Sequence, residues 1–114
     1  MAKLPDLTIA TVLRLQQQLL ESINETTEAE FLLFEQFGET DETNDYFDQL
    51  QNSKERAESY YLRLFTVLRE IYRSQPMASR DNLKLLDRYI NEAEATIDAI
   101  AATVSEIRRD FHLP

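Results

Sequence analysis

The chain has 114 residues and carries a net charge of −9, from 21 acidic against 12 basic side chains. Its length and its 43% hydrophobic content suit one elongated core, so we expect a single domain over residues 1–114. The negative charge repels phosphate backbones and anionic lipid surfaces, so the sequence argues against nucleic acid and membranes as partners.

The composition points to helices throughout. Gly38 is the single glycine, Pro5, Pro76 and Pro114 are the three prolines, and cysteine is absent. A protein with many strands needs more turn residues than this, and a chain without cysteine has no disulfide, thiol nucleophile or thiolate metal site. No window of 18 apolar residues and no secretory signal pattern occurs, so the sequence predicts a cytoplasmic protein.

The first predicted helix covers residues 5–37. Pro5 suits a first helical position, and Gly38 suits a left-handed C-terminal cap. The middle of this helix lacks large side chains after Ile23, and Thr27 with Glu30 has the spacing of a capping box. A kink or a restart near residues 24–27 is therefore one expectation, and a continuous helix is the other.

The second predicted helix covers residues 43–74, after a polar turn that offers Thr40, Asp41 and Thr43 as caps. Its apolar residues alternate at spacings of three and four, and Lys54 is the one polar residue among them. Pro76 disfavours helical geometry at the residue before it and so ends the helix.

The third predicted helix covers residues 80–111, with Ser79 as its N-cap. It carries the longest heptad pattern in the chain, formed by Leu83, Leu86, Ile90, Ala93, Ile97, Ile100, Val104, Ile107 and Phe111. A repeat of this kind is typical of coiled-coil-like packing between helices.

Short turns between three long helices predict an all-α, up-down-up antiparallel bundle. In length and helix count the chain resembles the three-helix bundle of spectrin repeats, in outline only. A first hairpin folded near residue 40 places Glu25 level with Arg56, and Glu28 level with Lys54. A second hairpin folded near residue 77 places Tyr61 opposite Ala93, so that a large residue faces a small one.

Four consecutive apolar residues, Phe31 to Phe34, stand out in the first predicted helix. Consecutive residues on a helix point in about four directions 100° apart, so two neighbouring helices cannot cover all of them. This run predicts an association surface at the end of the bundle that bears the first turn. Its candidate residues are Phe31, Leu32, Phe34, Phe37, Tyr46 and Phe47.

Acidic residues cluster in and after the first predicted turn, with no basic residue among them. They are Glu39, Asp41, Glu42, Asp45 and Asp48. Such a run is typical of a solvated turn and of the start of a helix, where the dipole favours negative charge. It also fits the acidic surface of an inhibitor or immunity-type protein that binds a basic partner.

Catalytic chemistry finds little support in the residue types. His112 is the single histidine and lies near the carboxyl terminus, which disfavours a histidine-containing metal centre. Glu25 with Glu28 and Glu42 with Asp45 resemble the paired carboxylates of MazG-type nucleotide pyrophosphohydrolases, which use magnesium. The hairpin register separates these two pairs by about 12 Å along the bundle, too far for one magnesium ion.

The sequence therefore predicts a non-catalytic helical protein that acts through protein–protein contacts, as a homodimer or with another helical protein, and that needs no cofactor. The acidic inhibitor is the alternative, and the magnesium-dependent pyrophosphohydrolase is the third reading.

Overall fold

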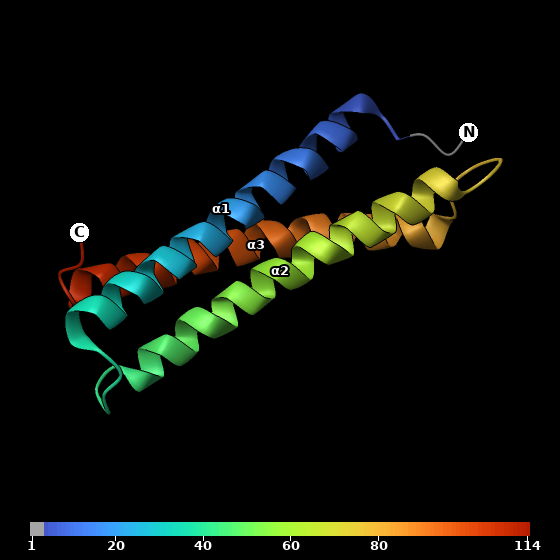
Figure 1. The fold of residues 1–114 in the computed structure, drawn as a ribbon. Coiled ribbons are helices and arrows are strands. Elements are labelled where there is room, and N and C mark those ends of the chain that lie inside the picture. The colour runs from blue at the N-terminus through green and yellow to red at the C-terminus, as the bar shows by residue number, and fades with distance from the viewer. Residues whose placement is uncertain (1–3) are drawn as a thin grey trace.

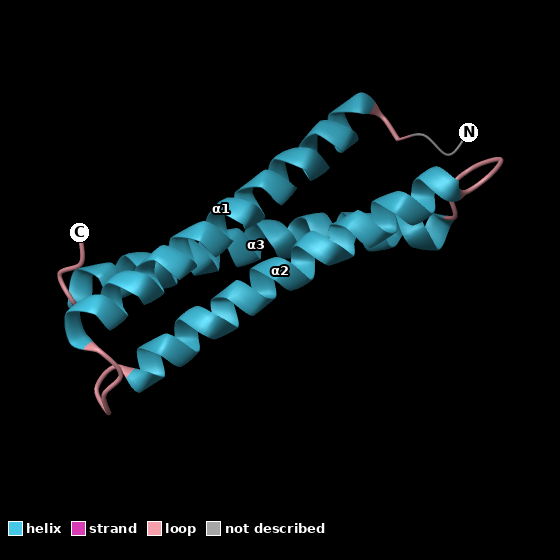
Figure 2. Ribbon diagram, viewed as in Figure 1, coloured by secondary structure: helices cyan, strands magenta, loops and turns pink. Residues whose placement is uncertain are grey.

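The protein is a bundle of three long helices. The structure, a computed structural model, describes residues 4–114 and contains α1 (Asp6–Phe37), α2 (Asn44–Arg73) and α3 (Arg80–Asp110), as Figures 1 and 2 show. The helices run up, down and up, and each packs against the other two. The bundle measures 56 × 21 × 17 Å. The first turn and the carboxyl terminus lie at one end, and the second turn lies at the other (Figure 1).

The predicted all-α fold and the three predicted helices are confirmed, with boundaries that differ by one residue. Pro5 lies just before α1 rather than inside it, while Ser79 caps α3 as predicted, its side chain accepting a hydrogen bond from the Asn82 N–H at 3.1 Å. The first three residues of the predicted domain lie outside the described part of the chain.

Of the two expectations for α1, the continuous helix is confirmed and a restart is wrong, because α1 is one helix of 32 residues. Its sparse middle packs inward: Ser22 and Thr26 are buried, and so is Ala29. Thr26 is fully enclosed, and its hydroxyl donates to the backbone oxygens of Ser22 and Ile23 at 3.0 and 2.9 Å. Since each hydroxyl is satisfied by its own helix, these small polar residues can be buried without breaking the helix.

The core runs the length of the bundle and is built mainly from leucine and isoleucine. Ala57 and Ala93 are also fully buried, where one helix approaches another closely. The largest enclosed side chains are Leu15, Leu19, Leu33, Leu50, Leu64, Ile71, Leu86, Ile100 and Ile107. At about 1.5–3 kcal/mol for each fully buried large apolar side chain, this core is the main source of stability.

The first turn is held by hydroxyl groups and one glycine. Thr43 is 1% exposed, and its hydroxyl donates to the Gly38 carbonyl at 2.8 Å and accepts from the Thr40 N–H at 2.9 Å. Thr43 precedes α2 as the predicted cap position, but its side chain bonds back into the turn and makes no cap hydrogen bond. Gly38 has φ +69° and ψ −175°, which is an extended conformation open only to glycine and not the predicted left-handed cap.

Polar contacts between helices show the register. The Tyr60 hydroxyl of α2 donates to Glu92 of α3 at 3.1 Å. This contact agrees closely with the predicted register of the second hairpin, in which Tyr61 lies opposite Ala93. The predicted pairing of Glu28 with Lys54 is wrong, because Lys54 binds Glu30 at 2.7 Å and Glu28 binds Arg108 of α3 at 3.2 Å. The first hairpin is therefore offset by about half a helical turn from the predicted register.

Candidate interaction surfaces

The predicted interface residues gather at the first-turn end, and we call them the first-turn patch (Phe31, Leu32, Phe34, Phe37, Tyr46 and Phe47). Phe31, Phe34 and Phe37 are 62%, 57% and 46% exposed. Leu32, Tyr46 and Phe47 are half-buried. Leu33, in the middle of the apolar run, is fully buried, so the helix divides the run between core and surface as expected.

Phe111 belongs to the same end of the bundle, although the sequence analysis assigned it only to the α3 core. Its ring packs edge-on against Phe37 and Tyr46, with centroid distances of 5.3 and 4.8 Å. The rings thus join the ends of all three helices. The sequence signal that could have found this contact is the position of Phe111 at the end of α3, level with the first turn.

The five predicted acidic residues are all exposed: Glu39, Asp41, Glu42, Asp45 and Asp48. Within residues 4–114 none of them forms an ion pair with a basic side chain. Their carboxylates therefore face solvent beside the first-turn patch.

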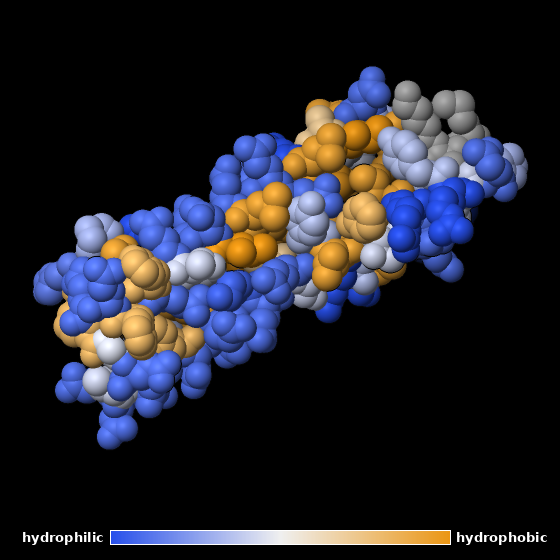
Figure 3. Space-filling view, in the orientation of Figure 1, coloured by the Kyte–Doolittle hydropathy of each residue, from blue (hydrophilic) through white to orange (hydrophobic). Residues whose placement is uncertain are grey.

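A second apolar area lies over the opposite half of the α1–α2 face. Figure 3 shows two apolar areas on this side of the molecule, with hydrophilic residues between them. The exposed large apolar side chains of these halves of α1 and α2 include Leu13 and Leu20 at 55% and 50%, and Phe65 and Tyr72 at 49% and 46%. Phe65 and Tyr72 line a shallow hollow with Leu68, and Arg69 lies 5.6 Å from the Phe65 ring centroid.

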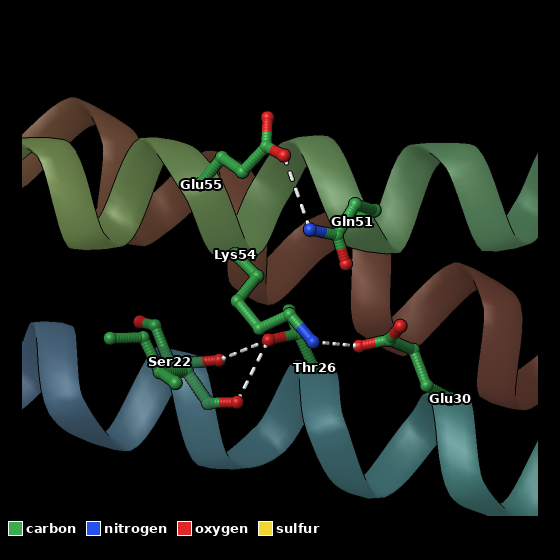
Figure 4. A network of polar contacts seen from close by, with 7 residues as sticks. Ser22, Thr26, Glu30, Gln51, Lys54 and Glu55 are labelled. Carbon is green, nitrogen blue, oxygen red and sulfur yellow. Dashed lines mark hydrogen bonds and ion pairs between the residues drawn. The ribbon is translucent and has the colours of Figure 1, made fainter.

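The ion pair between Lys54 and Glu30 bridges α2 and α1 (Figure 4). Its two side chains are only 21% and 23% exposed. Lys54 is the one polar residue of the predicted α2 seam. Its side chain extends toward α1 and passes beside the buried Thr26, as Figure 4 shows. The pair shows that Glu30 of α1 and Lys54 of α2 lie level with each other.

The carboxylates of the pyrophosphohydrolase reading do not converge. Glu28 binds Arg108 and lines a hollow between α1 and α3 together with Glu25, whereas Glu42 lies in the first turn and Asp45 at the start of α2. In the described part of the chain, no group of three or more His, Asp or Glu side chains is placed to hold a metal ion.

No family model, curated protein or solved structure matches this chain. Among residues 4–114, no helix combines the length and the apolar character that a membrane crossing requires.

Proposed function

We propose that the protein is a non-catalytic interaction protein that associates with a second copy of itself through its exposed apolar side chains. The observation that carries this proposal is the exposure of Phe31 and Phe34 on a rigid, fully helical α1. Large aromatic side chains are depleted from free surfaces and enriched at interface centres. A folded bundle that leaves two phenylalanines of one helix more than half exposed has a surface suited to association.

The test compares the mass of the native protein with that of two variants by light scattering after size exclusion. The native chain is expected near twice 13.4 kDa, and the Phe31→Glu/Phe34→Glu variant near 13.4 kDa. Leu62→Glu is the matched control, because Leu62 is 59% exposed on α2, outside the first-turn patch, and it should keep the native mass. Circular dichroism should show equal helicity in all three proteins.

A native chain that elutes as a monomer at tens of micromolar would refute self-association. A double variant that keeps the native mass would refute the assignment of the interface to these phenylalanines.

The acidic inhibitor remains a second candidate, supported by the five exposed carboxylates in and after the first turn, which form no ion pair with a basic side chain of residues 4–114. Binding to a basic protein should then weaken steeply as salt rises from 50 to 500 mM, because exposed charges are screened over a Debye length of about 10 Å at 0.1 M. Replacing Asp41, Glu42 and Asp45 by Asn and Gln should abolish that binding, and salt-independent binding would contradict this reading.

A further inference from the structure

The outward face of α1 carries a second heptad pattern that points away from the core. Its residues alternate at spacings of three and four along the helix, and all of them are exposed. We call them the outer seam: Ala10, Leu13, Gln17, Leu20, Asn24, Thr27, Phe31 and Phe34. The outer seam contains no charged residue, in a chain of which 29% is charged. It joins the first-turn patch to the second apolar area.

The corresponding face of α3 shows that the bundle does not require an apolar outer seam. At the outward positions of α3, at the same alternating spacings, the chain carries polar, charged or small residues, namely Lys84, Arg88, Asn91, Ala95, Asp98, Ala102, Ser105 and Arg109. These residues are also exposed, as a solvated helix face should be. The two helices occupy equivalent places in one bundle, so the uncharged seam on α1 needs a separate cause.

A spacing of three and four residues is the pattern by which two helices interdigitate as a coiled coil. In the outer seam Leu13, Leu20, Thr27 and Phe34 take one of the two repeating positions, and Ala10, Gln17, Asn24 and Phe31 take the other. The natural occupant of such a seam is a helix that carries the same pattern. The α1 helix of a second copy of this chain carries that pattern in its own outer seam.

We propose that two copies of the protein pair through the outer seams of their α1 helices, running antiparallel, as an inference that rests on the self-association proposed above. The twofold axis then passes near residue 22 of each α1. Leu13 packs against Phe31 of the second copy, Gln17 against Thr27, and Leu20 against Asn24. At each end Ala10 lies opposite Phe34, so that the smallest seam residue receives one of the largest.

The parallel alternative has one argument in its favour, because leucine at one seam position and a single asparagine at the other are typical of parallel dimers. A parallel pair, however, places Phe31 and Phe34 each against its own copy and leaves Ala10 facing Ala10. One end of the seam would be overfilled and the other underfilled.

The distribution of charge decides between the two orientations. Residues 35–48, at the first-turn end, contain six acidic and no basic side chains. Residues 63–88, at the opposite end, contain six basic and three acidic side chains. In an antiparallel pair the acidic end of each copy lies beside the basic end of the other, whereas a parallel pair brings the two acidic ends together.

The area of the outer seam is compatible with a stable dimer. Its four large apolar side chains are 50–62% exposed. With roughly 200 Å² for a complete side chain of this size, they expose about 450 Å² per copy. A standard interface buries about 800 Å² per partner, and the polar seam residues and the flanks can supply the remainder.

The test is disulfide cross-linking, for which the absence of native cysteine is an advantage. Gln17→Cys and Thr27→Cys are exposed, uncharged positions of the outer seam, and each variant is oxidised alone and in an equimolar mixture. In the antiparallel pair Cys at 17 meets Cys at 27 of the other copy. Two copies of Cys at 17 would be about 15 Å apart, beyond the ~7 Å that a disulfide allows between Cα atoms.

The expected result is a covalent dimer in the mixture, at least tenfold more abundant than in either variant alone. Asn91→Cys mixed with Ser105→Cys, both on the outward face of α3, is the control for random collision and should give none. Cross-linking of each variant alone would show a parallel pair and overturn the proposed orientation while keeping self-association.

Light scattering of the reduced variants separates the remaining failures. A doubled mass without any cross-link would place the dimer interface elsewhere and overturn only this inference. A monomeric mass for the native protein would overturn self-association as well.

Discussion

Replacing Lys54 by Met while Glu30 is kept leaves a carboxylate in the groove between α1 and α2 without its partner. The two charged atoms are 2.7 Å apart, and the side chains are only 21% and 23% exposed. Two unit charges 4 Å apart attract by about 4 kcal/mol at an effective dielectric constant of 20. Most of this attraction offsets the loss of water around each charge, so the intact pair itself adds little.

Removing one partner destabilises the protein, because the remaining charge is still shielded from water and has lost the attraction that offset this cost. Breaking a fully buried pair costs about 3–5 kcal/mol, and with a fifth of each side chain exposed we expect about 2 kcal/mol for Lys54→Met. At roughly 4 °C per kcal/mol for a domain of this size, the melting temperature should fall by about 8 °C. The melting temperature of the Glu30→Leu variant should fall by a similar amount.

The double variant Lys54→Met/Glu30→Leu should instead lie within about 1 kcal/mol of the native protein, since an apolar pair can replace a buried ion pair without loss. Thermal and urea unfolding of all four proteins, followed by circular dichroism at one concentration, measures the coupling energy. The matched control is the exposed pair Arg88 and Glu92 of α3, 62% and 39% exposed and 3.7 Å apart, whose coupling should be about 0.3–0.5 kcal/mol. If Lys54→Met melts within 2 °C of the native protein, or if the double variant loses the sum of both single losses, the reasoning fails.

Two substitutions test the first turn. Gly38→Ala should destabilise the protein by about 1–3 kcal/mol, because φ +69° with ψ −175° is strained for any residue with a Cβ. Steric crowding is not the cause, since no atom lies within 4 Å of the added methyl group. An unchanged urea midpoint would show that the turn adopts another conformation. Thr43→Val keeps the volume and removes a buried hydroxyl that serves the Gly38 carbonyl and the Thr40 N–H, so we expect a loss of about 1–3 kcal/mol. Thr43→Ser, which retains the hydroxyl, is its control and should lose clearly less, whereas equal losses would assign the effect to the methyl group.

The sequence predicted the three helices and their antiparallel order because each seam has a clear periodicity and each turn has polar or proline residues. The middle of α1 was misread for a physical reason. The lack of large side chains after Ile23 and the capping-box spacing of Thr27 and Glu30 suggested a break, yet Ser22 and Thr26 are buried there, and their hydroxyls bind the backbone of their own helix. Tertiary packing outweighs the local helix propensity of these residues, because small side chains let neighbouring helices approach closely.

The surface of α1 was harder to predict than its core. Leu15 and Leu19 are buried, while Leu13 and Leu20 are half exposed, and all four fit an apolar helical pattern. Periodicity alone cannot say which of two apolar stripes faces the core when a helix carries both. The first-turn patch was predictable because four consecutive apolar residues exceed any single stripe, whereas the contact of Phe111 with that patch depends on how far α3 extends.

The hydroxyl-bonded first turn has a consequence for how copies of this chain could exchange parts. Helical hairpins swap domains when the turn straightens and two helices fuse into one, so that each copy completes the other's core. Straightening here would strip Thr43 of its buried bonds and would place Gly38, with its high conformational entropy, inside a helix. The turn therefore works against exchange, and pairing should proceed by the collision of two already folded bundles, at a rate set by concentration and not by unfolding.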